Sequence, residues 1–197
     1  LKTGHAGTLD PLASGLVVIC TGKATKKINE LIGQDKEYLA TLFIGKTTPS
    51  FDLETETDGN YPTEHITEEL VRKELAGFQG EQQQIPPMHS AKFINGKRAY
   101  EYARKGIDLD LPPVKVFFHE IELVKYSLPE VTVRIRCSKG TYIRSFARDF
   151  GKALGSGCYL SSLKRTSSGK FKLENAFTLE KFSEYLEQLQ QNDSLYV

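Results

Sequence analysis

The sequence predicts an α+β fold, in which strands and helices are mixed along the chain without a regular βαβ alternation. Alternating apolar and polar residues mark several strands, turn sequences join some of them into hairpins, and no strand–helix–strand unit recurs at constant spacing. With 197 residues, 39% of them hydrophobic, the chain can bury a substantial core in one domain.

The first third of the chain predicts a loop followed by strands and one short helix. Residues 4–15 form a glycine-rich loop, and the apolar run at 16–20 predicts a buried strand. Residues 24–34 predict a short helix, and the alternation over 37–44 predicts a second strand. The polar, acidic segment 46–65 predicts a mobile surface loop, long enough to be a functional element.

The middle of the chain predicts a capped helix and then a separate basic unit. Thr67 is the expected N-cap of a helix over 67–76, with two glutamates in its first turn. Ile85-Pro86-Pro87 interrupts regular structure. The basic unit at 90–106 combines a short strand, a turn at Asn95-Gly96 and a short helix.

The last third predicts a strand pair, a helix, a further strand and a C-terminal helix. Apolar residues alternate with Thr132, Arg134 and Arg136, so these polar side chains share one face of a strand. The expected elements are paired strands at 114–126 and 130–137, a helix at 142–154, a strand through Leu160 and Leu163, and a helix at 179–190 capped by Thr178.

Charge is strongly segregated although the net charge is only +1. Residues 134–172 hold ten Lys or Arg and one acid, whereas residues 52–84 hold nine acids and two basic residues. A solvated face is the common explanation of such a run. Aromatic residues interleaved with the basic residues favour a polyanion instead, which predicts nucleic acid as the partner.

Composition excludes several classes of protein. No apolar run approaches the length of about 18 residues that a membrane helix needs, and no signal peptide is visible. Cys20, Cys137 and Cys158 are odd in number and lack Cys-x-x-Cys spacing, so we expect a reducing compartment, the cytoplasm, and no disulfide framework. The four histidines are equally scattered, and we expect no metal. The first residue is Leu1, which suggests that an upstream part is missing.

Four places are candidates for chemistry. Asp10 precedes a proline, which holds its backbone extended; the ordinary alternative is a turn aspartate that bonds its own loop. Arg144 opens a helix, a poor place for a cation unless a carboxylate pairs with it, and the alternative is a solvated arginine. Tyr38 is a core tyrosine by default, and Leu163-Lys164-Arg165 is by default a strand with basic flanks.

Five motifs, taken together and in register, closely resemble bacterial TruB-type tRNA pseudouridine synthases, which convert the uridine at position 55 in the T-loop of tRNA. The resemblance covers residues 2–177. The motifs are HAGTLDP at 5–11, KEY at 36–38, IPPMHSAK at 85–92, YEYAR at 100–104 and CSKGTYIR at 137–144.

The resemblance implies roles for individual residues. Asp10 corresponds to the catalytic aspartate, Arg144 to its arginine partner, and Tyr38 to a tyrosine that stacks on the uracil and helps to move a proton. His5, Tyr142 and Leu163 correspond to residues that contact the flipped nucleotide or line its pocket. Basic residues are expected to contact RNA: Lys92, Lys97, Arg98, Arg104, Lys139, Lys164 and Arg165.

The resemblance also implies the architecture and the partners. We expect a pseudouridine-synthase fold, with a mixed, mainly antiparallel central sheet flanked by helices. Residues 1–197 would form the catalytic domain, without the family's N-terminal segment and C-terminal PUA-type domain, and residues 85–106 a T-loop-binding insertion. The expected partner is the T-arm of tRNA, with no cofactor, no membrane, no obligatory protein partner, and a monomeric enzyme in the cytoplasm.

The chemistry leaves alternatives open. An ionised Asp10 can attack the ribose C1′, take a ribose proton to give a glycal, or add to the uracil ring. A single motif-borne acid suits an isomerisation that excludes water better than a hydrolysis that uses two carboxylates. Two other functions compete: the related enzyme of guide-RNA particles, which shares the Asp loop but is disfavoured by the 85–106 unit, and a non-catalytic RNA-binding module.

Overall fold

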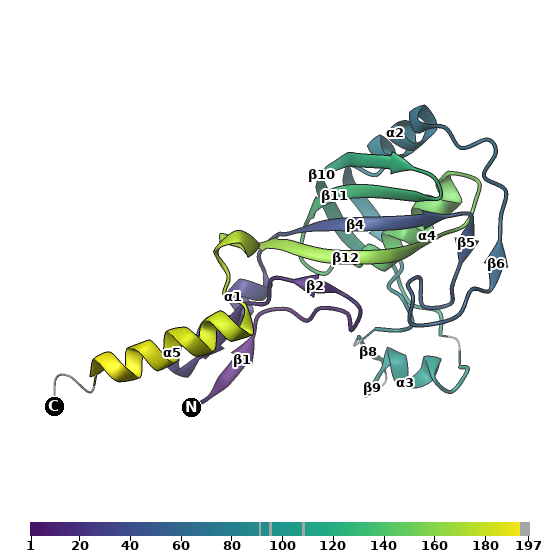
Figure 1. Ribbon diagram of the computed structural model, residues 1–197. Helices are drawn as coiled ribbons and strands as arrows, with labels where there is room; N and C mark the ends of the chain where they lie inside the picture. Colours follow the sequence, from purple (N-terminus) through teal and green to yellow (C-terminus); the bar gives the residue numbers. More distant parts are fainter. Residues whose placement is uncertain (91, 95, 108, 194–197) are drawn as a thin grey trace.

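The computed structural model describes residues 1–90, 92–94, 96–107 and 109–193, and it is organised around a seven-stranded sheet (Figure 1). The strand order is β13-β12-β4-β11-β10-β7, with β2 beside β12. Only the β2–β12 pair is parallel; the other pairs of this sheet are antiparallel, which confirms the predicted mainly antiparallel α+β fold. The strands are β2 (Ser14–Gly15), β4 (Lys36–Ile44), β7 (Gly80–Gln84), β10 (Val114–Ser127), β11 (Glu130–Cys137), β12 (Cys158–Ser168) and β13 (Phe171–Lys172).

Alternation along the strands gives the sheet one apolar face, as the sequence predicts. In β4, Ala40, Leu42 and Ile44 are buried, and the antiparallel register sets Leu42 opposite the buried Val131 of β11. The other face is mixed: Thr41 and Thr132 are hydrogen-bonded across the strands at 3.3 Å, and the Phe43 ring stacks on that of Tyr159 with their centroids 5.1 Å apart. A strand with one buried face shows a period of two in its sequence, which explains why these elements were predictable.

Two helices pack on the apolar face: α2 (Glu68–Gly77) and α4 (Ile143–Ala153). The predicted cap of α2 is confirmed, since the Thr67 hydroxyl accepts a hydrogen bond from the Leu70 amide at 3.2 Å. Phe146 of α4 is buried among three aromatic rings, with centroid distances of 5.2 Å to Phe78, 5.4 Å to Phe118 and 5.8 Å to Phe150. These contacts fix α4, and therefore its N-terminal end, against the sheet.

The buried strand predicted at 16–20 is wrong. The structure has a two-stranded sheet of β1 (Thr3–His5) and β3 (Ile19–Thr21). Leu16 and Cys20 are buried, but Ile19 is 57% exposed. A short strand with one partner buries only one face, so its apolar run does not report full burial. The helix predicted at 24–34 is a 3-10 turn, Gly22–Lys27, followed by α1 (Ile28–Ile32).

The segment 46–65 contains paired strands and buried residues, which corrects the expectation of a mobile surface loop. It pairs β5 (Lys46–Thr47) with β6 (Gly59–Asn60), and between them Thr48, Ser50 and Asp52 are buried. Buried polar groups require partners. The partners of Thr48 and Ser50 are local: their hydroxyls donate to the Asp52 carbonyl at 2.7 and 3.2 Å.

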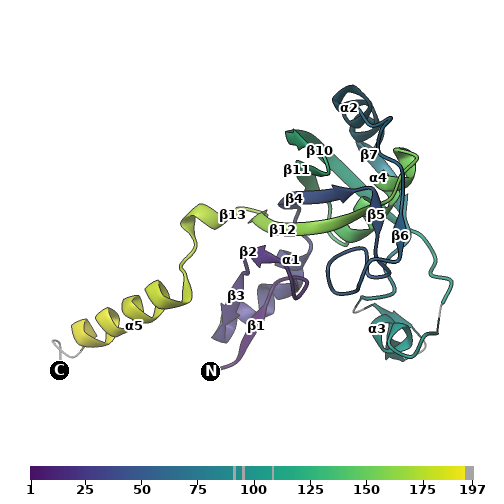
Figure 2. The same cartoon turned by 45° about the vertical axis from the view of Figure 1, so that its right-hand side comes forward.

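The basic unit and the C-terminal helix lie outside the main sheet (Figure 2). The unit contains β8 (Phe93–Ile94), β9 (Lys97–Arg98) and α3 (Ala99–Ala103), as expected, while Asn95 of the predicted turn lies outside the described residues. The last helix, α5 (Leu179–Asp193), follows the 3-10 turn Leu173–Asn175 and projects away from the sheet in both views. None of the helices in the described part of the chain is long and apolar enough to cross a membrane.

The aromatic cluster gives a first prediction. Phe146→Ala removes a side chain that is 1% exposed, and we expect the free energy of unfolding to fall by about 3–5 kcal/mol. Phe117→Ala is the matched control, because Phe117 is 42% exposed on the neighbouring face of β10. Urea denaturation followed by circular dichroism measures both variants, and equal losses would contradict this account of the core.

Candidate active site

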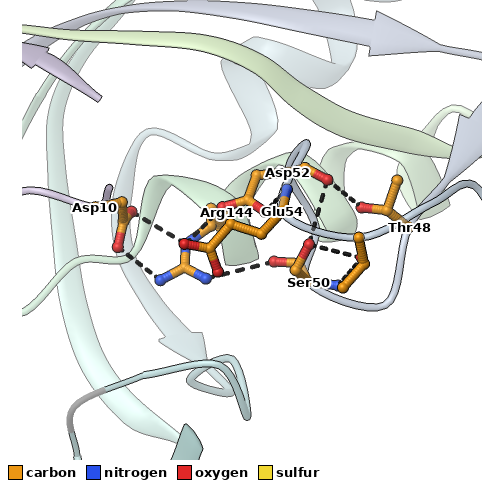
Figure 3. A network of polar contacts seen from close by, with 7 residues as sticks. Asp10, Thr48, Ser50, Asp52, Glu54 and Arg144 are labelled. Carbon is orange, nitrogen blue, oxygen red and sulfur yellow. Dashed lines mark hydrogen bonds and ion pairs between the residues drawn. The ribbon is translucent and has the colours of Figure 1, made fainter. Parts of the chain in front are cut away.

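Asp10 and Arg144 form a two-pronged ion pair across 134 residues of sequence (Figure 3). The Arg144 Nε donates to Asp10 Oδ2 at 3.0 Å, and Nη2 donates to Oδ1 at 2.7 Å. The Arg144 side chain is only 4% exposed, whereas that of Asp10 is 33% exposed. Arg144 is therefore not a solvated arginine, and the Asp10 carboxylate is directed at Arg144 instead of bonding its own loop as a turn aspartate does.

A second carboxylate, Asp52, contacts the same guanidinium. Its Oδ2 lies 3.5 Å from Arg144 Nε, and its side chain is 5% exposed. The Arg144 Nη1 also donates to the Ser50 carbonyl at 3.5 Å. Asp52 was not among the residues predicted from the sequence, because it lies in an acidic segment whose composition suggests a surface loop. The one signal in the sequence was the set of hydroxyl residues around Asp52, whose side chains can hydrogen-bond to the backbone of a buried turn.

The loop that carries Asp52 is held in a specific backbone conformation. Asp52 Oδ1 accepts a hydrogen bond from the Glu54 amide at 3.0 Å. Phe51 has a φ of 64°, in the left-handed region that a bulky residue rarely adopts, and the Arg148 guanidinium lies 5.0 Å from its ring centroid. The loop therefore holds the Asp52 carboxylate against Arg144, at a cost in backbone strain at Phe51.

The start of α4 brings Arg144 to the two acids. Gln84, at the end of β7, accepts from the Tyr142 amide at 2.8 Å and donates to the Tyr142 carbonyl at 3.1 Å. Tyr142 is the N-cap residue of α4. The positive end of the helix dipole favours carboxylates near it, so the two acids offset the poor placement of a cation there.

A cleft of about 1000 Å³ has the Asp10–Arg144 ion pair in its lining. Its lining includes five residues that sequence analysis assigned to catalysis or the nucleotide: Asp10, Tyr38, Tyr142, Arg144 and Leu163. The basic unit contributes a second group to the lining, namely Ser90, Lys92, Tyr100 and Arg104, and His89 lies directly before it. The structure thus brings the core motifs and the unit at 90–106 to one concave surface, as a small-molecule or nucleotide site requires.

Tyr38 supplies an aromatic wall of the cleft from β4. Burial raises the pKa of Tyr38 to about 12, while the nearby Arg165 guanidinium acts in the opposite direction. The phenol is therefore a neutral hydrogen-bond donor at neutral pH.

The other predicted residues are more widely spread. His5 is exposed on β1 and does not line the cleft. Lys97 and Arg98 lie on β9 at the outside of the basic unit, and Arg98 packs over the Phe93 ring at 4.2 Å. Lys139 and Lys164 are exposed beyond the cleft lining.

Arg165, which was expected to contact RNA, lines the cleft but is only 1% exposed. Its guanidinium donates to main-chain carbonyls of the Asp10 loop. Internal pairing also reduces the expected basic face: Arg134 pairs with Glu122, and Arg148 pairs with Asp149. Among the described residues, no three His, Cys, Asp or Glu side chains are grouped as metal ligands.

Two family models together match residues 1–196 of the chain. The model described as TruB family pseudouridylate synthase (N terminal domain) matches residues 1–143. The model described as tRNA pseudouridylate synthase B C-terminal domain matches residues 144–196.

Curated relatives match over nearly the whole chain. A protein named tRNA pseudouridine synthase B from Phocaeicola vulgatus is 56% identical over 188 residues, which cover 95% of this chain and 80% of the relative. A protein of the same name from Flavobacterium johnsoniae is 53% identical over 186 residues, covering 94% and 81%.

Solved structures share the fold. A chain of the "Crystal Structure of a Cbf5-Nop10-Gar1 Complex" matches with a TM-score of 0.75 and 28% identity, covering 98% of this chain and 48% of that one. The "Crystal structure of the archaeal box H/ACA sRNP Nop10-Cbf5 complex" matches with a TM-score of 0.71 and 25% identity, covering 98% and 47%. The chain belongs to the TruB family of pseudouridylate synthases, isomerases that act on RNA.

Proposed function

We propose that this chain converts the uridine at position 55 in the T-loop of tRNAs to pseudouridine, with Asp10 as its catalytic residue and without a cofactor. The Asp10–Arg144 pair at the cleft carries the proposal, because it presents one partly exposed carboxylate in a fixed orientation. The curated relatives named tRNA pseudouridine synthase B support the choice of tRNA as substrate.

The chemistry needs a glycosidic bond to break and a carbon–carbon bond to form between the same two fragments. No redox change is involved, and water must be kept from the detached ribose. Asp10 supplies the accessible carboxylate, and Asp52 is too buried to serve as the second carboxylate that hydrolysis requires. Attack on C1′, glycal formation and addition to the uracil ring all place a carboxylate oxygen of Asp10 against the nucleoside.

The uridine must leave the folded T-loop to reach Asp10, so the base is flipped into the cleft. Tyr38 supplies a stacking surface and a neutral phenol for proton movement, and Leu163 and Tyr142 line the same space. His5 lies outside that lining and would occupy the gap that the base leaves in the RNA.

The basic unit is the proposed T-loop-binding insertion, with Lys92, Lys97, Arg98 and Arg104 against the RNA backbone. Lys139 and Lys164 are the exposed cations that extend this contact. The enzyme would act as a monomer in the cytoplasm, without a protein partner. The solved neighbours are named as complexes of Cbf5 with other proteins, so an enzyme that needs such partners is the competing proposal, which an assay with protein and tRNA alone distinguishes.

Removal of the Asp10 carboxylate tests the proposal directly. Asp10→Asn keeps the size of the side chain, and we expect no pseudouridine in unmodified tRNA while tRNA binding persists. Asp58→Asn, on an exposed acid that accepts a hydrogen bond from Thr47, is the matched control and should leave the product unchanged. Mapping of pseudouridine in tRNA incubated with the protein alone measures both. Near-normal product with Asp10→Asn would refute the proposal.

Neutralisation of the basic unit tests the RNA contact. Lys97→Gln with Arg98→Gln should weaken tRNA binding and lower the slope of log K against log salt by up to about 2, because each phosphate contact contributes roughly one. Lys73→Gln with Arg72→Gln, on the exposed face of α2, removes the same charge and should leave the slope unchanged. Binding of tRNA to both double variants is measured at several salt concentrations. Equal effects of the two double variants would contradict the assignment of Lys97 and Arg98 to the RNA contact.

The raised pKa of Tyr38 predicts how the rate depends on pH. The folded value of about 12 lies above the ordinary value, so the phenol stays protonated through pH 10. We expect Tyr38→Phe to lower the single-turnover rate by about tenfold or more, by the same factor from about pH 7 to 10. The stability that the buried phenol contributes is present below about pH 10 and lost as the pH rises through about 12. A rate ratio that changes near pH 10 would contradict the raised value.

A further inference from the structure

Arg165 is a buried cation whose guanidinium reaches both ends of the loop that carries Asp10. Its Nε donates to the Leu16 carbonyl at 2.7 Å, and its Nη2 donates to the Gly7 carbonyl at 3.1 Å. Asp10 lies between these two residues in the chain, so one side chain joins the start of the loop, after β1, to its end, after β2. Hydrogen bonds from a charged donor are stronger than neutral ones, which favours this closure.

The backbone of Arg165 holds the same loop a second time. Its carbonyl accepts from the Leu16 amide at 2.9 Å, and β2 pairs in parallel with β12, with Gly15 opposite Arg165. Gly15 has a φ of 101°, and a Cβ there would lie 2.3 Å from the Arg165 carbonyl oxygen. Only glycine permits this approach.

The strand register places Arg165 beside the other wall of the cleft. In the β4–β12 pair, Arg165 is opposite Tyr38, and both line the cleft. No carboxylate of the described residues forms an ion pair with Arg165. A buried cation without one is costly to the fold. That cost is offset here by hydrogen bonds to two carbonyls of the Asp10 loop and to the Tyr38 side chain, so the partners of Arg165 are the loop and the wall of the cleft.

We propose that Arg165 is a positioning residue: it closes the Asp10 loop through Gly7 and Leu16 and so sets the Asp10 carboxylate against Arg144 and the substrate. This inference rests on the proposed catalytic role of Asp10. It gives Arg165 a function in the chemical step and none in contact with the RNA backbone.

The test separates the chemical step from RNA binding. Single-turnover rates at saturating enzyme, tRNA Kd and its salt slope, and thermal unfolding are measured for Arg165→Lys and Arg165→Met. Lysine keeps the charge but has a single nitrogen in place of the two, Nε and Nη2, with which Arg165 reaches the two carbonyls, so we expect the rate to fall about tenfold, and about a hundredfold with methionine. The Kd should stay within about threefold of the wild-type value with an unchanged slope. Lys125→Met, on the exposed face of β10, is the control for loss of one charge.

A glycine pair tests the closure without touching the charge. Gly15→Ala should displace the loop from β12 and lower the single-turnover rate at least tenfold, with Kd preserved. Gly77→Ala is the matched control, since a Cβ at Gly77 meets nothing within 4 Å. If Arg165→Met does not fold, Arg165→Lys and Gly15→Ala still decide.

Two results would overturn the inference. In one, the Arg165 variants bind tRNA more weakly with a lower salt slope, yet react at the normal rate when saturated, which is the behaviour of an RNA contact. In the other, the rates of Arg165→Lys and Gly15→Ala equal the wild-type rate. The wild-type protein and Asp10→Asn, run in the same assay, reveal a failure of the proposed function independently of both results.

Discussion

The buried Arg144 guanidinium is the constraint on which the site depends. It lies at the start of α4 and contacts carboxylates from two other parts of the chain, Asp10 and Asp52. A buried cation left without its partners costs several kcal/mol, so the three segments are stable only together. The aromatic packing of Phe146 fixes the helix, and the helix fixes the guanidinium, so the core of the fold determines where Asp10 points.

The two acids that contact Arg144 differ in their environment. Asp10 is partly exposed to the cleft, while Asp52 is enclosed by its own loop and accepts a hydrogen bond from the Glu54 amide. One guanidinium between two carboxylates leaves one net negative charge, which the positive end of α4 helps to stabilise. Unequal surroundings of this kind leave the Asp10 carboxylate accessible from the cleft and keep the Asp52 carboxylate away from it.

Local periodicity made much of the fold predictable from the sequence, and its absence explains the errors. β4, β10, β11, α2 and α4 each bury one face against the core, so their patterns carry the period of the element. The run at 16–20 was wrongly predicted as a buried strand, because β3 pairs with one strand only. The segment 46–65 was wrongly predicted as a mobile loop, because hydrogen bonds among its own residues keep polar groups buried there. Asp10, Arg144 and Tyr38 could be singled out through motifs. Asp52 could not, because its burial depends on a partner 92 residues away.

Arg144 and Arg165 show why residue type alone does not predict the role of a buried cation. Both are almost fully buried and both belong to a segment that reads as basic, yet one meets carboxylates and the other meets main-chain carbonyls. Strand alternation explains the difference at β12: Leu163 and Arg165 face the cleft, whereas Lys164 between them is exposed. On this one strand, Leu163 lines the cleft, Arg165 bonds the Asp10 loop, and Lys164 is exposed. Counting Lys and Arg along the sequence does not distinguish Lys164 from Arg165. The pairing of β12 with β4 does, because it sets Arg165 opposite Tyr38 of the cleft.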